Sequence, residues 1–334
     1  MSDILGRADL TRPPGVIDTL TAGYQIINRR PWLLLFPIVL DLVFWLGPKL
    51  SLVRLAGYLP FGLLSSDELT SFTDGLARFN LLFLLALYVP TVLGKAYLPA
   101  AAAAVAGTPE GTSFAPRLVY QVLPESFALA VAVLLPLGLV LGALYLGGIG
   151  QLVRADQAAG SVRERMLAWL RVARRCCWRI AALNAVGLLA AAVLVTPWAL
   201  AIALAAASSP VLAGFLLLLF QVALVWVAFY LFFALDAVVV SEANPLQAVR
   251  SSIQVVRTSF WSAVAFIGLI LVIGTGLPLV WRMVSGQVVG LAASIVANAY
   301  IGTGLAAGSM LYYRDRLQHV QGQSIGNDGS SSNI

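Results

Sequence analysis

The sequence predicts an all-α polytopic membrane protein with about six transmembrane helices and three amphipathic interfacial helices arranged as a threefold, hairpin-like repeat. Of its 334 residues, 60% are hydrophobic and only 11% are charged, whereas soluble domains carry about 25% charged residues. The mean hydropathy is +0.89. This composition excludes a soluble enzyme, a disordered protein and a nucleic-acid-binding domain, even though the isoelectric point is near 9.6.

Six apolar stretches are expected to cross the membrane, because about 20 apolar residues in a helix span the hydrocarbon core. The first, Pro31–Gly47, is shorter than the others and contains Asp41, and Leu50–Gly57 extends it. It follows a segment without a secretory signal core, so we expect it to act as an uncleaved signal anchor. The other five stretches are Ser126–Gly150, Ile180–Ala206, Val211–Asp236, Phe260–Trp281 and Val288–Leu311.

A seventh apolar stretch, Phe79–Ala106, decides the topology. Pro90, Lys95 and Pro99 interrupt it; proline removes helical hydrogen bonds, and a lysine at the bilayer centre costs about 2.5–3.5 kcal/mol. We predict that it is a re-entrant or interfacial segment of an external insertion, residues 58–123. The alternative is a kinked seventh span. Charge bias does not separate the two models: six spans leave 15 of the 21 Lys and Arg residues inside, and seven spans leave 14.

An internal repeat favours six spans. Three times, an amphipathic basic segment with apolar residues three and four positions apart runs into a span marked by tryptophan. Such helices are expected to lie flat at the lipid headgroups with the apolar face toward the lipid. If the copies are equivalent, each enters from the same side and crosses an even number of times. The three segments are Val16–Trp32, Ser161–Trp178 and Asn244–Trp261.

The repeat predicts a division of the chain and an orientation. We expect a multi-pass protein of the plasma or inner membrane with both termini in the cytoplasm. The tail is rich in Ser, Gly, Asn and Gln and is predicted to be disordered. The first unit is residues 1–150, the second 151–242, the third 243–317 and the tail 318–334.

The third unit carries a resemblance to a known family. Leu231–Trp261 reads LFFALDAVVVSEANPLQAVRSSIQVVRTSFW. It resembles a pattern in the integral-membrane domain fused to some bacterial glycerophosphodiester phosphodiesterases and in related six-helix bacterial membrane proteins. The last span ends in Tyr312-Tyr313-Arg314-Asp315-Arg316, which is similar to the aromatic–Asp–x–Arg ending of that family with altered spacing. The resemblance covers roughly Gln151–Arg316 and implies six helices and cytoplasmic termini, but no phosphodiesterase activity, which belongs to a separate soluble domain.

A cluster of arginines precedes the third predicted span. Guanidinium groups bind phosphate in a bidentate manner, and each basic group near an anionic leaflet contributes about 1 kcal/mol. The cluster predicts a site for anionic lipid headgroups or a docking surface for a membrane or cytoplasmic partner. The alternative is that it only fixes topology, as basic loops do. Its members are Arg163, Arg165, Arg171, Arg174, Arg175 and Arg179.

Polar residues within the spans are the remaining candidates. Asp41, opposite Lys95 if that segment dips inward, predicts an ion or proton site; the alternative places Asp41 at the external interface. Gln221, and likewise Asn184 and Asn298, are expected to form interhelical hydrogen bonds. We expect Asp236 and Glu242 to cap a helix or to pair with Arg250. Three G-x-x-x-G pairs predict close helix packing or a homodimer, and they are Gly138/Gly142, Gly286/Gly290 and Gly304/Gly308.

Metal, cofactor and enzyme chemistry are not expected. The only cysteines, Cys176 and Cys177, are adjacent, and His319 is the only histidine, whereas structural zinc needs four ligands. No nucleotide, metalloprotease or serine-hydrolase motif is present. The sequence therefore predicts a non-catalytic accessory or scaffold protein that engages anionic lipids or a membrane partner. The alternatives are a transporter or permease subunit in which Asp41 lines a polar path, and an integral-membrane enzyme that relies on carboxylates.

Overall fold

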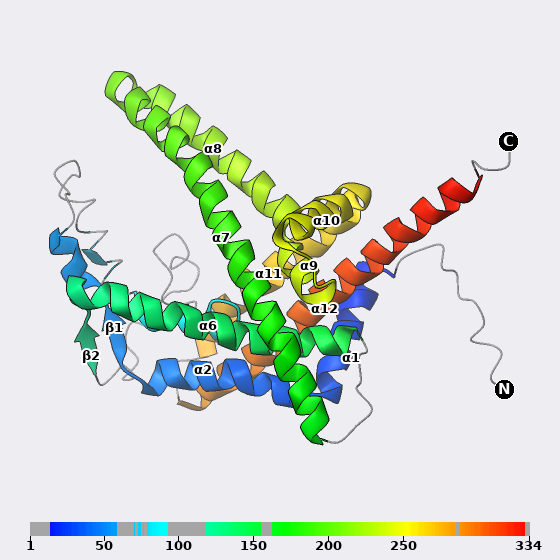
Figure 1. The fold of residues 1–334 in the computed structure, drawn as a ribbon. Coiled ribbons are helices and arrows are strands. Elements are labelled where there is room, and N and C mark those ends of the chain that lie inside the picture. The colour runs from blue at the N-terminus through cyan, green and yellow to red at the C-terminus, as the bar shows by residue number, and fades with distance from the viewer. Residues whose placement is uncertain are drawn as a thin grey trace. The chain divides into compact units, whose positions relative to one another are not determined.

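The described part of the chain is all-α apart from one pair of short strands, which confirms the predicted fold class (Figure 1). The computed structural model describes residues 14–58, 79–92, 118–154, 162–284 and 288–330 and positions 70, 73, 74 and 76. Its helices are α1 (Val16–Arg29), α2 (Leu35–Leu46), α6 (Pro124–Val153), α7 (Val162–Ser208), α8 (Pro210–Leu231), α9 (Ala234–Val240), α10 (Pro245–Thr258), α11 (Phe260–Val284) and α12 (Val288–Ser330). Three 3-10 helices, η1 (Pro31–Leu34), η2 (Val53–Tyr58) and η3 (Leu81–Ala86), and the strands β1 (Lys49–Ser51) and β2 (Val119–Gln121) complete them.

The described residues fall into two compact units, and each is considered by itself. The first unit takes residues from Met1–Ala22, Trp178–Gly268 and Gly308–Ile334. The second takes residues from Gly23–Cys177 and Leu269–Ala307. Helices α1, α7, α11 and α12 contribute residues to both units.

Four helical stretches in the described part of the chain are long and apolar enough to cross a membrane. The protein is therefore multi-pass. A fifth crossing is formed if α10 and α11, which meet at a bend of 107°, count as one span. The predicted number of six is not confirmed. The four stretches are Pro124–Val153, Met166–Ser208, Pro210–Val240 and Val288–Gln321.

The first predicted span is shorter in the structure than the sequence suggests. The apolar helical stretch ends at Leu46, and Gly47 closes it with an N–H···O bond to Val43. Leu50–Gly57 does not extend the helix, because Pro48 disfavours a helical residue before it. Lys49–Ser51 instead forms β1, which pairs in parallel with β2, and η2 follows. The expected helical extension was wrong.

The three amphipathic segments do not share one conformation. α1 and α10 are separate helices, as predicted: α1 ends before Pro31, and α10 ends at Thr258. The second segment is continuous with its span in α7, a single helix of 47 residues. The reason lies in the sequence, because no proline or glycine interrupts α7 before Gly187.

The apolar faces of the two separate helices pack against protein. α10 packs against α9 and α8, and it buries Ala248, Val255 and Val256 completely. α1 buries Leu20 and Ile27. Other helices of the chain therefore cover part of the sides predicted to rest on lipid, whereas Leu246 of the predicted α10 face is 66% exposed.

Glycines allow helices to approach closely, as the G-x-x-x-G spacing predicts. A Cβ at Gly138 would lie 1.9 Å from the carbonyl oxygen of Leu84, and one at Gly142 would lie 2.7 Å from Tyr88. The backbone of residues 79–92 therefore rests directly on α6. In α12, a Cβ at Gly304 would lie 2.1 Å from the ring of Tyr24. Gly286 lies outside the described residues.

The stretch Phe79–Ala106 is described only as far as residue 92. Its described half forms η3, a 3-10 helix of six residues, in place of a helix long enough to span a bilayer. Leu81, Leu85 and Ala86 are buried there, against α6 and α2. Residues 93–106, including Lys95, lie outside the described residues, so the re-entrant arrangement stays a prediction.

The end of the chain differs from its prediction. α12 continues to Ser330, so residues 318–330 are helical where the sequence predicts disorder. No proline follows Val288, and the hydrogen-bond ladder of α12 is free to continue.

Substitution of Gly138 tests the close approach of α6. Gly138→Ala should lower the free energy of unfolding by about 1–3 kcal/mol, because the new methyl group meets a backbone carbonyl that has little room to move. Gly187→Ala is the matched control, since a Cβ there meets nothing within 4 Å. Thermal unfolding in detergent measures both, and equal melting temperatures for the two variants would contradict the packing.

Candidate functional site

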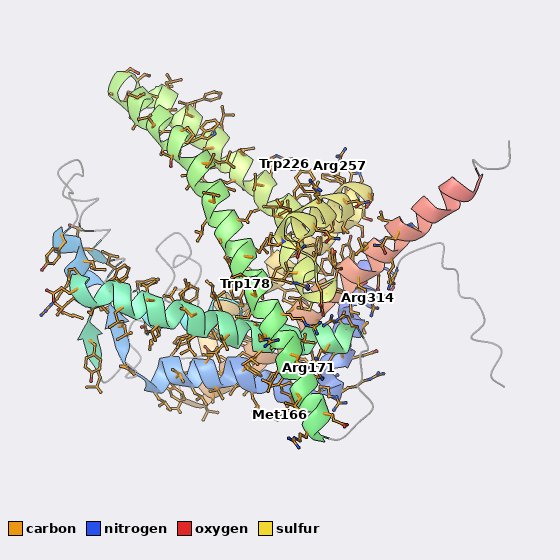
Figure 2. The ribbon with its side chains drawn as sticks, viewed as in Figure 1. Met166, Arg171, Trp178, Trp226, Arg257 and Arg314 are labelled. Carbon is orange, nitrogen blue, oxygen red and sulfur yellow. The ribbon has the colours of Figure 1, made fainter. Side chains whose placement is uncertain are left out.

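The N-terminal half of α7 presents an exposed face on which arginines alternate with apolar residues. Positions three and four apart lie on one side of a helix, and the five residues that form this side are all exposed. We call this surface the α7 basic face. Figure 2 labels Arg171 in the N-terminal half of α7. The members of the α7 basic face are Arg163, Leu167, Leu170, Arg171 and Arg174.

Two further members of the predicted arginine cluster belong to the same part of α7. Arg175 is exposed beside the α7 basic face. The side chain of Arg165 lies outside the described residues. The structure therefore places Arg163, Arg171, Arg174 and Arg175 together at the surface of the second unit, as the spacing of the sequence predicts.

The opposite side of this helical segment is fixed to α6. Trp169 donates a hydrogen bond from Nε1 to the carbonyl oxygen of Leu144 at 3.1 Å, and its ring meets that of Trp32 edge to face at 5.7 Å. Ala173 is buried, and a Cβ at Gly147 would lie 3.6 Å from its Cα. Because this side packs against protein, the basic face points away from it.

Arg179 differs from the other arginines. It is half-buried in the first unit, where its Nη1 lies 3.2 Å from Oε2 of Glu242. Glu242 has a φ of +50°, the one positive φ of a non-glycine residue within the described chain, and it sits in the short connection between α9 and α10. The expected pairing of Glu242 with Arg250 was wrong, because Arg179 takes that place.

Asp236 is buried in the first unit and is not paired with an arginine either. The hydroxyl of Ser309 donates a hydrogen bond to its Oδ2 at 2.5 Å. One turn further along α12, the Tyr313 hydroxyl lies 3.2 Å from Oγ of Ser241. The expectation that Asp236 caps a helix or pairs with Arg250 was therefore wrong.

Tyr312 forms the aromatic centre of this region. Its ring stacks on Phe266 at 4.3 Å and on Phe233 at 5.3 Å, and its hydroxyl donates to Ser262 at 3.0 Å. The guanidinium of Arg316 lies 5.0 Å from the centre of the Tyr312 ring. Phe233 and Tyr312, two of the residues that carry the family resemblance, thus lie in one packed core. Sequence reasoning missed Ser262 and Ser309 because serine in a span gives no pairing signal.

Asp41 is fully buried in the second unit. Its Oδ2 accepts a hydrogen bond from the backbone N–H of Val92 at 3.0 Å. Asn298 donates from Nδ2 to the carbonyl oxygen of Pro90 at 3.3 Å. Asp41 and Asn298 thus hold the backbone at the end of the η3 segment. The predicted opposition of Asp41 and Lys95 falls outside the described residues.

Gln221 lies on α8, which has no buried residue. Its side chain is exposed among apolar side chains, and within the described residues it has no hydrogen-bond partner. The expected interhelical hydrogen bond was therefore wrong for Gln221. Asn184 donates to the carbonyl oxygen of Ile180 in its own helix.

Metal ligands do not gather in the described part of the chain, where no three His, Cys, Asp or Glu side chains lie close enough to hold an ion. The thiol of Cys176 is buried and that of Cys177 is half-buried, and both are free of disulfide bonds. Among the predicted site residues that the structure describes, the exposed arginines of α7 form the largest group on one surface.

Loss of the Ser309 hydroxyl should destabilise the first unit. Ser309→Ala removes the hydrogen bond to the buried Asp236 carboxylate, which costs about 1.5–3 kcal/mol. The control Ser251→Ala removes only a hydroxyl that bonds to Ala248 within its own helix, so it should change stability by less than about 1 kcal/mol. Thermal unfolding of both variants in detergent measures the difference, and an unchanged Ser309→Ala variant would contradict a supporting role for this bond.

Comparisons with protein families, with characterised proteins and with solved structures find no match to this chain. The resemblance of the third unit to a bacterial membrane domain therefore stays a prediction. Any functional conclusion has to come from the site itself.

Proposed function

We propose that this multi-pass membrane protein is a non-catalytic accessory or scaffold protein that engages anionic phospholipids through the α7 basic face. The single observation that carries the proposal is the position of exposed arginines beside exposed leucines on one side of α7. Arginine binds phosphate with two parallel hydrogen bonds, and Arg174 precedes the apolar run of the same helix, which begins at Ile180.

The length of α7 supports this placement. Its 47 residues extend over about 70 Å, more than twice the ~30 Å of the hydrocarbon core. The apolar run that begins at Ile180 fills the core. Arg174 and Arg175 precede it by about 8 Å along the helix axis, which is the depth at which headgroup phosphates lie.

The proposed orientation places the α7 basic face in the cytoplasm of a bacterial cell, at the inner membrane. The concentration of arginine before this span supports that side, because cytoplasmic segments carry an excess of Lys and Arg. Anionic lipids also give the cytoplasmic leaflet a negative surface potential that attracts basic segments. The same orientation puts both termini inside and the turn between α7 and α8 outside.

Removal of two arginines tests lipid binding. Arg171→Gln combined with Arg174→Gln should weaken binding of phosphatidylglycerol by about 2 kcal/mol, since each arginine contributes about 1 kcal/mol. Native mass spectrometry of the purified protein measures lipid occupancy. The control, Lys49→Gln with Arg54→Gln, removes the same charge from the side proposed to face outward and should leave occupancy unchanged. Equal losses in both double variants would show that net charge, and not this face, retains the lipid.

Cysteine labelling tests the orientation. In a Cys176→Ser and Cys177→Ser background, an impermeant maleimide should label Ala207→Cys in intact cells and Thr258→Cys only after lysis. Both positions are exposed, one at the end of α7 and the other at the end of α10. The reverse pattern would invert the proposed orientation, and labelling of both in intact cells would mean that the intervening segment does not return to the cytoplasm.

A further inference from the structure

We infer that the outer face of α10 is a second lipid site, at which Arg250 and Arg257 together bind the phosphodiester headgroup of an anionic phospholipid. We call this surface the α10 arginine pair. It is separate from the α7 basic face in sequence and belongs entirely to the first unit. Four observations carry the inference: the free charge, the spacing, the groove and the angle of the helix.

The two guanidinium groups are available to a ligand. Arg250 and Arg257 are exposed, and neither has a hydrogen-bond or ion-pair partner within the described residues. The acidic residues of this part of the chain are engaged elsewhere, because Glu242 pairs with Arg179 and Asp236 accepts from Ser309. Within the described residues, no acidic side chain therefore neutralises either of these two cations.

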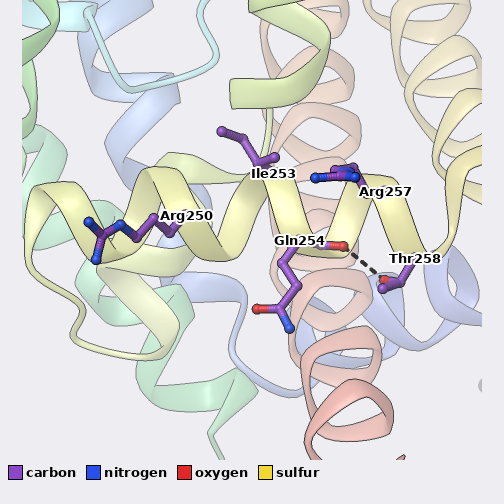
Figure 3. Close-up of a pocket in the computed structure, with 5 residues that line it drawn as sticks. All are labelled: Arg250, Ile253, Gln254, Arg257 and Thr258. Carbon is purple, nitrogen blue, oxygen red and sulfur yellow. Dashed lines mark hydrogen bonds between the residues drawn. The ribbon is translucent and has the colours of Figure 1, made fainter.

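The spacing directs both cations to one ligand-sized region. The two arginines are seven positions apart, so they lie on the same side of α10, about 10 Å apart along its axis. A shallow groove of about 500 Å³, open to the surroundings, lies along α10 and is lined by both arginines and by Ile253, Gln254 and Thr258 of the same helix (Figure 3). The hydroxyl of Thr258 donates a hydrogen bond to the carbonyl oxygen of Gln254 at 2.9 Å. The amide of Gln254 is exposed and adds a neutral donor between the two charges.

The angle of α10 places this groove at the membrane surface. α10 meets α11 at 107°, so α10 lies close to the membrane plane when α11 crosses the bilayer. Trp261, at the start of α11, is 80% exposed, and tryptophan concentrates at the membrane interface. Leu246, one turn before Arg250, is 66% exposed. A leucine and a tryptophan thus flank the arginine pair at both ends.

This combination selects a phospholipid over a soluble anion. A free phosphate would use the two guanidinium groups but would leave Leu246 and Trp261 in water, whereas a lipid places acyl chain and glycerol against them. The bidentate geometry of arginine matches the non-bridging oxygens of a phosphodiester. The inference shares with the proposed function only the class of ligand, an anionic phospholipid. The residues and the helix that would bind it are different in the two sites.

The test measures lipid binding to the full-length protein with phosphatidylglycerol as the probe and phosphatidylcholine as the neutral lipid. Arg250→Gln combined with Arg257→Gln should weaken phosphatidylglycerol binding about 30-fold, since each arginine contributes roughly fivefold at an anionic surface. Arg250→Lys with Arg257→Lys keeps both positive charges but removes the paired N–H donors of the guanidinium groups. Its affinity for phosphatidylglycerol should therefore fall between that of the parent protein and that of the double glutamine variant. Both arginines are exposed and unpaired in the described chain, so all variants should keep the melting temperature of the parent.

Trp261 locates the bound lipid. The fluorescence of Trp261 is the difference between the parent protein and the Trp261→Phe variant. Phosphatidylglycerol with brominated chains should quench this fluorescence, and brominated phosphatidylcholine should quench it far less. The quenching should disappear in Arg250→Gln/Arg257→Gln and persist in Arg171→Gln/Arg174→Gln. Excess inorganic phosphate should not displace the lipid; full displacement would overturn the choice of a lipid as the occupant.

The outcomes separate this inference from the proposed function. Unchanged binding and quenching in the α10 double variant would overturn the inference, and a loss in the α7 double variant would still support the α7 basic face. Loss only in the α10 variant would support the inference and reject the α7 basic face. Equal losses for the glutamine and the lysine pairs would overturn the bidentate contact that defines this site.

Discussion

The need to satisfy polar groups within apolar helices governs the arrangement of charge in this protein. A buried carboxylate without a donor is costly in hydrocarbon, where water does not supply one. Asp41 is therefore bonded to the backbone N–H of Val92, and Asp236 to the hydroxyl of Ser309. Each of these two hydrogen bonds comes from a neutral donor. The arginines Arg171, Arg174, Arg250 and Arg257 stay exposed at the surface.

The two proposed lipid sites follow from this distribution. Arg179 is held by Glu242 and contributes to the structure, whereas Arg171 and Arg174 on α7 and Arg250 and Arg257 on α10 remain exposed. In each helix the arginines oppose a face that packs against protein. The buried side of each helix holds it to the fold, and the exposed arginines are left for the proposed contact with lipid headgroups.

Local sequence features predicted some elements and missed others for identifiable reasons. Pro31 and Pro245 mark the end of α1 and the start of α10, and both boundaries were predictable. The second amphipathic segment is continuous with its span because no proline or glycine interrupts the helix before Gly187. Comparison of the three repeated segments did not reveal this difference. The exposed arginines of α7 were predictable from spacing, but the diversion of Arg179 to Glu242 was not, since the two are 63 positions apart.

The sequence by itself determined that the protein is helical, multi-pass and without a cluster of catalytic motifs, because apolar length and composition act locally along the chain. Only the tertiary structure decided which charged side chains bind partners inside the fold. Pairing depends on distance between segments remote in sequence, as with Asp236 and Ser309, and spacing along one helix does not record it. The glycines combine both levels: their spacing is local, but the carbonyl of Leu84 that requires Gly138 comes from another segment.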